Sequence, residues 1–328
     1  MIEVENLHKT YHVRQHYRGA GGALRNMVTR SGSHVQAVND ISFSVAGGEI
    51  VGYVGPNGAG KSTTIKMLTG ILGPRSGRVV VDGLVPWQHR RQLAGKIGVV
   101  FGQRTQLWWD LPLIESLELL RHVYRVPTER FNANLSTFRE LLDLDPFLNT
   151  PVRQLSLGQR MRGDLAAALL HDPSILYLDE PTIGLDVVAK ARIREFLLDI
   201  NRQRGVTVLL TTHDMSDIAH LCKRMLVIDH GKLLYDGGVD ALRNRLGVER
   251  TLVVDLEGIQ HTDEPLVVDG AHEIRADGPR RWLRFRRDEI SAADLIARVT
   301  TRYRIQDLTL EEPQIESIVR RIYEEGLG

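Results

Sequence analysis

Short apolar runs alternate with segments of helical periodicity through the middle of the chain. The runs are apolar at nearly every position, whereas a half-exposed strand would alternate apolar and polar residues. Such runs are typical of a parallel sheet that helices cover on both faces. They are Ile50–Val54, Ile97–Phe101, Ser174–Asp179 and Val206–Thr212, and a hairpin of Met225–Asp229 and Lys232–Tyr235 follows. The pattern therefore predicts an α/β fold with a doubly wound core.

A stretch with a different hydrophobic pattern interrupts this core at about residues 104–171. Helical periodicity is present in Ile114–Tyr124, Phe131–Leu144 and Leu157–Leu170, and prolines separate these segments. Proline disfavours helix in its own position and before it, so each segment reads as one separate helix. We expect a helical subdomain inserted between two parts of the α/β core.

Two alternating stretches near the start, residues 1–11 and 35–45, predict strands. Residues 12–34 between them are rich in arginine and glycine. We interpret this basic insertion as a solvated surface segment. The alternative is a short basic amphipathic helix that lies on a membrane or on a permease.

The texture changes again after about residue 246. Short strands are predicted at 251–256, 272–275, 281–285 and 304–308, and helices at 292–300 and 312–323. We expect residues 1–245 to form one domain and residues 246–328 a small accessory α+β domain. Arg280–Arg287 carries several arginines, which we interpret as an edge strand with solvated side chains rather than as an anion-binding patch.

Composition and charge leave the partner open but restrict the compartment. The 328 residues carry 42 Lys and Arg against 41 Asp and Glu, a net charge of +1, so charge gives no reason to expect nucleic acid. The single cysteine, Cys222, excludes an internal disulfide and suits a reducing cytosol. No apolar run approaches the roughly 20 residues that a bilayer span needs, and the start lacks the regions of a signal peptide. Membrane association is therefore expected only through a partner or a surface helix.

The segment Gly55–Thr63, Gly-Pro-Asn-Gly-Ala-Gly-Lys-Ser-Thr, lies between a predicted strand and a predicted helix. A glycine-rich loop in this context turns consecutive backbone N–H groups inward, and the helix N-terminus adds partial positive charge. Lys61 adds a full charge, and the Ser62 hydroxyl is a ligand suited to Mg²⁺. The sequence therefore predicts a nucleoside triphosphate site.

Polar side chains follow three further predicted strands. Asp179 can hold Mg²⁺, and Glu180 beside it can orient and deprotonate an attacking water. Gln103 is a neutral ligand able to contact the metal and the water, and His213 can hydrogen-bond the γ-phosphate. Phosphoryl transfer needs such positioning and charge neutralisation rather than covalent chemistry.

Over about residues 1–240 the sequence resembles the ATP-binding subunits of ABC transporters. The resemblance rests on Gly55–Thr63 as Walker A, Gln103 as the Q-loop, Leu155–Arg160 as the signature, Ile175–Glu180 as Walker B with the catalytic glutamate, Gly184–Asp186 as the D-loop, and His213 as the switch histidine. It implies a P-loop NTPase core with a helical subdomain and an N-terminal antiparallel β-subdomain. It also implies ATP and Mg²⁺ as cofactors.

The resemblance assigns roles to the residues of these motifs. The catalytic set is Glu180, His213, Gln103 and Lys61, and the metal set is Ser62, Gln103 and Asp179. The nucleotide-binding set is Tyr11, Gly55, Asn57, Gly58, Gly60, Lys61, Ser62, Thr63, Ser156, Gly158, Gln159 and Asp186. By the same resemblance two copies pack head to tail, so that each ATP lies between the phosphate loop of one copy and Ser156 of the other.

Within the family, the motifs are most similar to ATPases of bacterial exporters whose permeases are separate polypeptides. This implies a homodimer docked on an integral membrane permease, at the cytoplasmic face of the inner membrane, with no nucleic acid bound. Trp108 and Trp109 lie where such subunits receive the permease. The alternative is a soluble ABC ATPase that acts on ribosomes or nucleic acid, and the transported substance stays open.

Two positions depart from the family's pattern. Leu157 stands in the signature where the family usually has glycine, while Ser156, Gly158 and Gln159 are retained. Tyr11 matches by position the aromatic residue that stacks on adenine, but the basic insertion follows it, and Tyr17 is the alternative.

Overall fold

The computed structural model describes residues 1–14, 32–101, 104–246, 249–257, 265–312 and 315–325. The chain divides into two compact units, Met1–Asp236 and Gly237–Gly328. The division falls earlier than the boundary expected after residue 245, because helix α9 (Val239–Leu246) belongs to the second unit and packs on helix α11 (Ile315–Glu325).

A six-stranded sheet forms the centre of the first unit, in the order β5-β6-β7-β3-β8-β9. Its strands are β3 (Ile50–Val54), β5 (Ile97–Phe101), β6 (Ile175–Asp179), β7 (Thr207–Thr212), β8 (Arg224–Asp229) and β9 (Lys232–Gly238). The pairs from β5 through β8 are parallel. Every residue of β3 and β7 is buried, as expected for interior strands covered on both faces. The predicted α/β core is confirmed.

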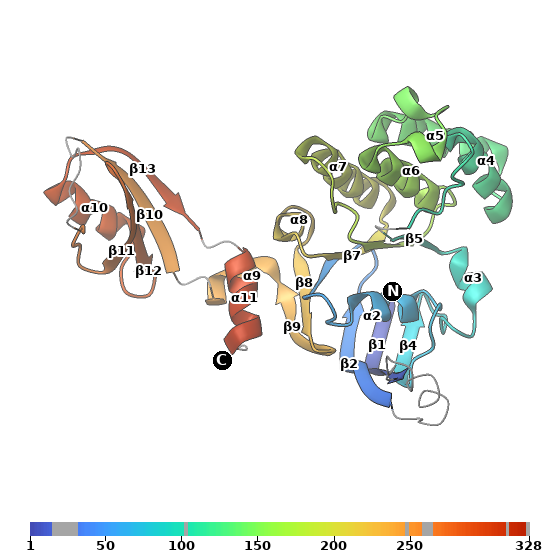
Figure 1. Ribbon diagram of the computed structural model, residues 1–328, viewed down its shortest axis with the longest axis horizontal. Helices are drawn as coiled ribbons and strands as arrows, with labels where there is room; N and C mark the ends of the chain where they lie inside the picture. The colour runs from blue at the N-terminus through green and yellow to red at the C-terminus, as the bar shows by residue number, and fades with distance from the viewer. Residues whose placement is uncertain (15–31, 102–103, 247–248, 258–264, 313–314, 326–328) are drawn as a thin grey trace, which may run out of the picture. The chain divides into compact units, whose positions relative to one another are not determined.

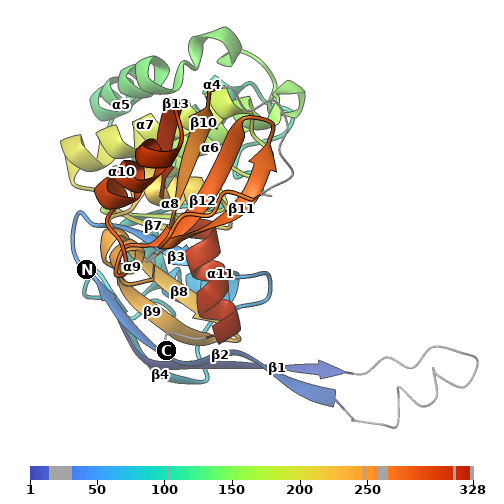
Figure 2. The same cartoon turned by 90° about the vertical axis from the view of Figure 1, so that its left-hand side faces the viewer.

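Beside this core lies a three-stranded antiparallel sheet in the order β2-β1-β4 (Figure 2). Its strands are β1 (Ile2–Arg14), β2 (Gly32–Val45) and β4 (Ser76–Val81). The β1–β2 pairing continues to Arg14 opposite Gly32, so both ends of the predicted insertion 12–34 extend the two strands. The sequence analysis ended these two strands too early. Residues 15–31, which include Tyr17 and most of the alternative amphipathic helix, lie outside the described residues.

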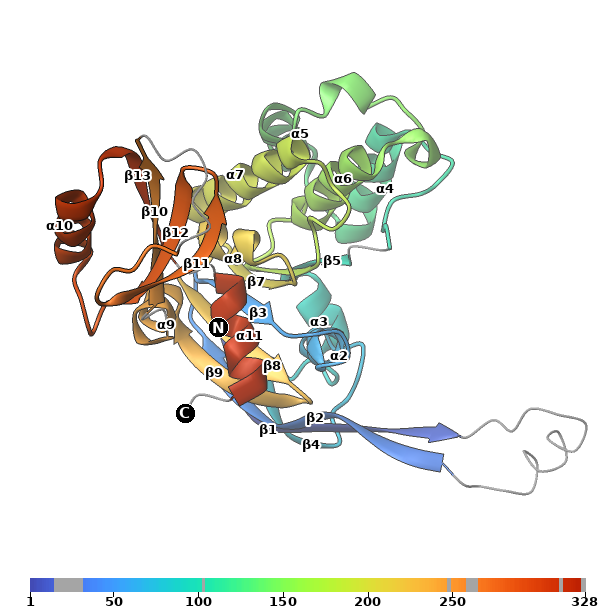
Figure 3. The same cartoon turned by 60° about the vertical axis from the view of Figure 1, so that its left-hand side comes forward.

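Helices surround the two sheets of the first unit. They are α2 (Lys61–Leu68), α3 (Arg90–Ala94), α4 (Leu113–Tyr124), α5 (Thr128–Leu142), α6 (Leu157–Leu169), α7 (Val187–Arg204) and α8 (Met215–Leu221). Helix α6 contacts both α4 and α5, and the three form the predicted helical insert (Figure 3). At Gly163 a Cβ atom would lie 2.8 Å from Cδ1 of Leu113 on α4, so the two helices approach closely there.

The second unit holds an antiparallel sheet in the order β11-β12-β10-β13 (Figure 1). Its strands are β10 (Glu249–Leu256), β11 (Ala271–Asp277), β12 (Arg280–Arg286) and β13 (Ile305–Glu311), and α10 (Ala292–Arg302) packs on one face. The prediction that Arg280–Arg287 forms an edge strand is wrong, because β12 lies between β11 and β10. Arg281 is only 2% exposed and pairs with Glu273 at 3.1 Å, so this arginine is part of the interior.

Among the residues that the model describes, none of the helices combines the length and apolar character needed to cross a bilayer.

Candidate nucleotide-binding site

The loop between β3 and α2 has backbone conformations that need glycine. Gly60 has φ +109°, and a Cβ atom there would lie 2.4 Å from the carbonyl oxygen of Ala37. Gly55 has a comparable restriction, since its Cβ would lie 2.6 Å from the carbonyl oxygen of Ile228. The backbone can therefore curl closely at both ends of the loop, as a phosphate cradle requires.

Lys61 is held inside this loop. Its Nζ donates hydrogen bonds to the carbonyl oxygens of Gly55 (2.5 Å) and Pro56 (3.1 Å), and the residue is 7% exposed. Burial lowers the pKa of the Lys61 ammonium, and the carboxylates of Glu180 and Asp179 act in the opposite direction. The buried ammonium attracts an anionic phosphate group, whereas the two carboxylates attract a cation.

Asp179 ends β6 next to the phosphate loop. Thr211 Oγ1 donates to Asp179 Oδ1 at 2.5 Å, and Ser62 Oγ donates to Asp179 Oδ2 at 3.0 Å. Ser62 and Asp179, the two described residues of the predicted metal set, are therefore in direct contact. Their oxygens are the donors that Mg²⁺ prefers.

Glu180 and His213 lie at the ends of neighbouring strands, and the structure brings their side chains together. Nδ1 of His213 is 3.3 Å from Oε1 of Glu180. Glu180 has φ +55°, and its backbone N–H donates to the carbonyl oxygen of Thr211 at 2.9 Å. This unusual backbone conformation for a non-glycine residue fixes the carboxylate at the sheet edge.

A pocket of about 560 Å³ joins these groups. The predicted residues that line it are Asn57, Gly58, Gly60, Lys61, Ser62, Thr63, Asp179 and Glu180, and the sequence analysis missed Ala37, Lys66, Ile71, Phe101 and Arg104. Phe101 ends a buried strand, which is a usable signal, whereas nothing in the sequence marks Arg104. Gln103 lies outside the described residues.

Tyr11 does not line this pocket in the described structure. It lies in β1 opposite Val35, and the Lys9 ammonium is 5.8 Å from the centre of its ring. Lys9 is itself fixed by a hydrogen bond to the carbonyl oxygen of Gly73 at 2.6 Å. Adenine stacking on Tyr11 therefore stays a prediction that rests on the resemblance.

The signature residues form the start of helix α6. Ser156 is the N-cap and Gln159 closes a capping box with it: Gln159 N donates to Ser156 Oγ at 3.2 Å, and Ser156 N donates to Gln159 Oε1 at 2.9 Å. The unusual Leu157 lies over the D-loop, since a Cβ at Gly184 would be 3.0 Å from Cδ2 of Leu157. Asp186 in turn caps α7, accepting from Ala189 N at 2.8 Å.

A buried ionic network connects the segment after Glu180 with the helix after His213. Asp217 is fully buried and accepts from Thr182 Oγ1 at 2.5 Å and from Arg194 Nε at 2.7 Å. Next to it, Asp214 pairs with Lys190 at 2.6 Å. Although burial opposes it, hydrogen bonds from Lys190 and Ser216 lower the pKa of Asp214 to about 2. This network holds the chain around both catalytic candidates in one arrangement.

Asp164, on α6, is a buried acid that the sequence analysis missed, because its partners are far along the chain. It is 5% exposed, and Thr105 Oγ1 and Gln106 N donate to its Oδ1 at 2.8 and 3.1 Å. Burial raises the pKa of Asp164 from 3.8 to about 6, against these hydrogen bonds, which lower it. The folded state therefore binds a proton more tightly than the unfolded state, and stability falls as pH rises from 4 to 6.

We expect Asp164→Asn to stabilise the protein at pH 7 by up to about 3 kcal/mol, because the amide has no charge to desolvate. Denaturant unfolding of both chains from pH 4 to 7 measures this difference. The two unfolding free energies should converge near pH 4. A difference that is constant with pH would contradict the raised pKa.

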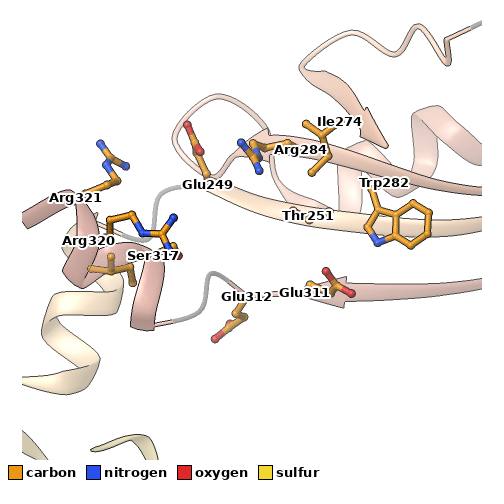
Figure 4. A pocket seen from close by; sticks show the side chains of 11 residues that line it. Glu249, Thr251, Ile274, Trp282, Arg284, Glu311, Glu312, Ser317, Arg320 and Arg321 are labelled. Atoms are coloured by element: carbon orange, nitrogen blue, oxygen red, sulfur yellow. The ribbon is translucent and has the colours of Figure 1, made fainter. Parts of the chain in front are cut away.

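A second pocket, of about 810 Å³, lies within the second unit (Figure 4). Trp282 and Ile274 line one part of it. Its charged lining consists of Glu249, Glu311 and Glu312 with Arg284, Arg320 and Arg321. Acidic and basic side chains are equal in number, so the lining selects no charge of ligand.

Comparisons with known proteins agree with this geometry. A family model described as ABC transporter matches residues 38–183. The chain is 33% identical over 208 residues to the ABC transporter ATP-binding protein NatA of Bacillus subtilis (strain 168), covering 63% of this chain and 84% of that protein. It is 39% identical over 205 residues to the Nod factor export ATP-binding protein I of Rhizobium leguminosarum bv. viciae, covering 62% of this chain and 65% of that protein, which is less than two thirds of it.

A solved dimeric structure of the ATP-binding cassette MJ0796, in a post-hydrolysis state with ADP and Pi, superimposes with a TM-score of 0.60 at 27% identity. The match covers 73% of this chain and 99% of that one. Sequence relatives and solved structures thus lead to the same family as the phosphate loop and its neighbouring carboxylates. The chain belongs to the ATP-binding subunits of ABC transporters and is an ATPase.

Proposed function

We propose that this chain is the motor subunit of a bacterial ABC exporter, hydrolysing ATP in a head-to-tail homodimer docked on a separate permease. The observation that carries the proposal is the meeting of five side chains at one sheet edge. Lys61 lies in the loop, Ser62 contacts Asp179, and Glu180 contacts His213.

The described residues fit Mg²⁺. Ser62 Oγ and Asp179 Oδ2 are 3.0 Å apart and open to the pocket. When bound, Mg²⁺ would neutralise charge on the β- and γ-phosphates. Gln103 is the third ligand that the family resemblance implies.

The protein's own groups account for the rest of the reaction. Lys61 and the loop N–H groups bind and orient the phosphates. The Glu180 carboxylate accepts a proton from the attacking water, and His213, 3.3 Å from Oε1 of Glu180, holds this carboxylate and the γ-phosphate in place. Glu180 thus acts as the general base, while Lys61, the loop N–H groups and His213 position the reactants and stabilise charge.

Two features that a single chain leaves exposed support the proposed dimer: a helix N-terminus and a pair of valines. Ser156 caps a helix whose N-terminus attracts anions, yet it is not among the described residues that line the pocket of its own chain. Beside the D-loop, Val187 and Val188 are 82% and 71% exposed, an unusual state for adjacent apolar residues. A second copy would cover them and supply the second half of each site.

Cross-linking between chains tests this dimer. The native Cys222 is buried, so Asn57→Cys in one chain and Leu157→Cys in another each introduce one accessible thiol. Mixed in a Glu180→Gln background with Mg²⁺ and ATP, the two chains should form a disulfide-linked pair. Asn57→Cys mixed with Glu140→Cys, on the surface of α5, is the matched control. Equal cross-linking in both mixtures, or none with ATP present, would contradict the head-to-tail arrangement.

Exposed apolar side chains on the helical insert support the proposed docking on a permease. Trp108 and Trp109 are 42% and 53% exposed, and Val123 on α4 is 66% exposed. Trp109 also carries the Arg160 guanidinium 5.4 Å from its ring centre. Exposed tryptophans of this kind are typical anchors of protein interfaces.

Fractionation with and without a co-expressed permease tests this docking. We expect the chain at the cytoplasmic face of the inner membrane only when the permease is present, and Trp108→Ala with Trp109→Ala should release it. Sedimentation with ribosomes, independent of a permease, would support the alternative soluble ATPase.

Residues 246–328 are proposed as an accessory domain, since the nucleotide pocket takes no described lining residue from them.

A further inference from the structure

Helix α6 connects two parts of the chain. In the proposed dimer, one part faces the ATP of the partner copy, and the other lies near the chain's own ATP. Its first residue follows Ser156, which would face the nucleotide of the partner copy. Asp164 lies eight residues further along the same helix, about 12 Å from Ser156 at 1.5 Å per residue. A displacement of the helix at Asp164 therefore also moves its N-terminus.

Asp164 fastens this helix to the segment that directly follows Arg104, a residue that lines the chain's own nucleotide pocket. Its Oδ1 accepts from Thr105 Oγ1 and from Gln106 N, and its backbone carbonyl accepts from Gln106 Nε2 at 3.1 Å. We call these three residues, Thr105, Gln106 and Asp164, the Asp164 clasp. Arg104, directly before them, lines the pocket and donates its N–H to the carbonyl oxygen of Phe101 at 2.9 Å.

The clasp is built for rigidity. Thr105 Oγ1 also accepts from Leu107 N at 3.1 Å, which closes a tight turn around the threonine. Leu107 is buried, and its Cδ1 would lie 3.1 Å from a Cβ at Gly163, the neighbour of Asp164. Polar bonds and close packing thus join the same two segments, so that neither can shift alone.

We propose that Asp164 is a positioning residue that makes the signature end of α6 follow the wall of its own nucleotide pocket. Nucleotide in one site then sets the place of the Ser156 cap in the other site, and the two ATP sites are coupled. The inference rests on the proposed head-to-tail dimer. It concerns a residue that contacts no nucleotide itself.

The geometry of these hydrogen bonds identifies a substitution of Asp164 that should keep them. The Thr105 hydroxyl and the backbone N–H of Gln106 both donate to Oδ1, and Oδ2 takes no part in these bonds. Asparagine keeps an oxygen acceptor at that place, whereas alanine removes it. Asp164→Asn should therefore preserve the clasp, and Asp164→Ala should open it.

Ser116→Ala is a matched control, because it removes a hydrogen bond between the segment after Arg104 and a different helix, α4. Trp108 N donates to Oγ of the buried Ser116 on α4 at 3.2 Å, and Ser116→Ala removes that bond while it leaves the three residues of the Asp164 clasp unchanged. Thr105→Val removes one donor of the clasp with little change of shape. It serves as a second test if Asp164→Ala fails to fold.

The experiment measures kcat and KM for ATP, together with ATP-dependent dimerisation of each variant in the Glu180→Gln background. We expect Asp164→Ala and Thr105→Val to lower kcat about tenfold and to weaken the dimer, a typical size for coupling between sites. ATP binding to the isolated subunit should stay within about twofold. Asp164→Asn and Ser116→Ala should keep kcat within about threefold of the unmodified chain.

Two outcomes would overturn the inference: unchanged kcat and dimerisation in Asp164→Ala and Thr105→Val, or equal loss in Asp164→Ala and Ser116→Ala. The unmodified chain separates this inference from the proposed function. If it forms no ATP-dependent dimer, the head-to-tail arrangement fails. If it dimerises and the clasp variants behave like it, only the role of Asp164 fails.

Discussion

Glu180→Gln is expected to lower the rate of ATP hydrolysis by about 10²- to 10⁴-fold, the usual contribution of a general base. Glutamine has the shape of glutamate and keeps an oxygen near His213, whose Nδ1 lies 3.3 Å from Glu180 Oε1 in the unmodified chain. It cannot accept the proton of the attacking water. The variant should therefore bind ATP and remain in the ATP-bound dimer, which size-exclusion chromatography with Mg²⁺ and ATP would detect beside a phosphate-release assay.

The matched control is Glu195→Gln, which removes an exposed carboxylate of α7 away from the pocket. Its turnover should equal that of the unmodified chain. Full hydrolysis by the Glu180→Gln variant would remove Glu180 from the proposed role.

Lys61→Ala is expected to weaken ATP binding by about 10- to 100-fold, which corresponds to one strong charged hydrogen bond. The side chain is 7% exposed, and its Nζ already lies against the loop carbonyls. The other cationic side chains that line the pocket, Lys66 and Arg104, are exposed and are not held inside the loop. Isothermal titration with ATP measures the loss directly.

Lys96→Ala is the control for that experiment, because Lys96 pairs with Asp82 at 2.7 Å outside the nucleotide pocket. Circular dichroism of both variants shows whether the fold is retained. Unchanged ATP affinity in a folded Lys61→Ala protein would contradict the phosphate-loop interpretation.

Much of the site follows from the sequence because its chemistry sits at strand ends. Asp179 and Glu180 end an apolar run, and His213 follows another such run. Parallel strands bring their carboxyl ends to one edge of a sheet, so side chains far apart in sequence meet there without further information. The phosphate loop is predictable for a similar reason, since its glycines, lysine and serine form one contiguous segment.

The residues that the sequence did not reveal depend on long-range contacts. Asp164 reads as an ordinary polar residue of a helix, and only the folded chain brings Thr105 and Gln106 to it. Arg281 reads as a solvated arginine, yet strand order places β12 inside its sheet, where Glu273 neutralises it. Strand order cannot be read from alternation, because an edge strand and an interior strand carry the same period of two.

Gly163 places a limit on how related chains can differ from this one. A glycine inside a helix lowers the stability of the helix by about 0.5–1 kcal/mol relative to alanine. We infer that the close packing of Leu113 against Gly163 offsets this cost. Leu113 is fully buried, and its Cδ1 would have to move to admit a methyl group at position 163. Relatives with alanine or serine at position 163 should therefore have a smaller residue than leucine at 113, and substitutions at these two positions should occur together.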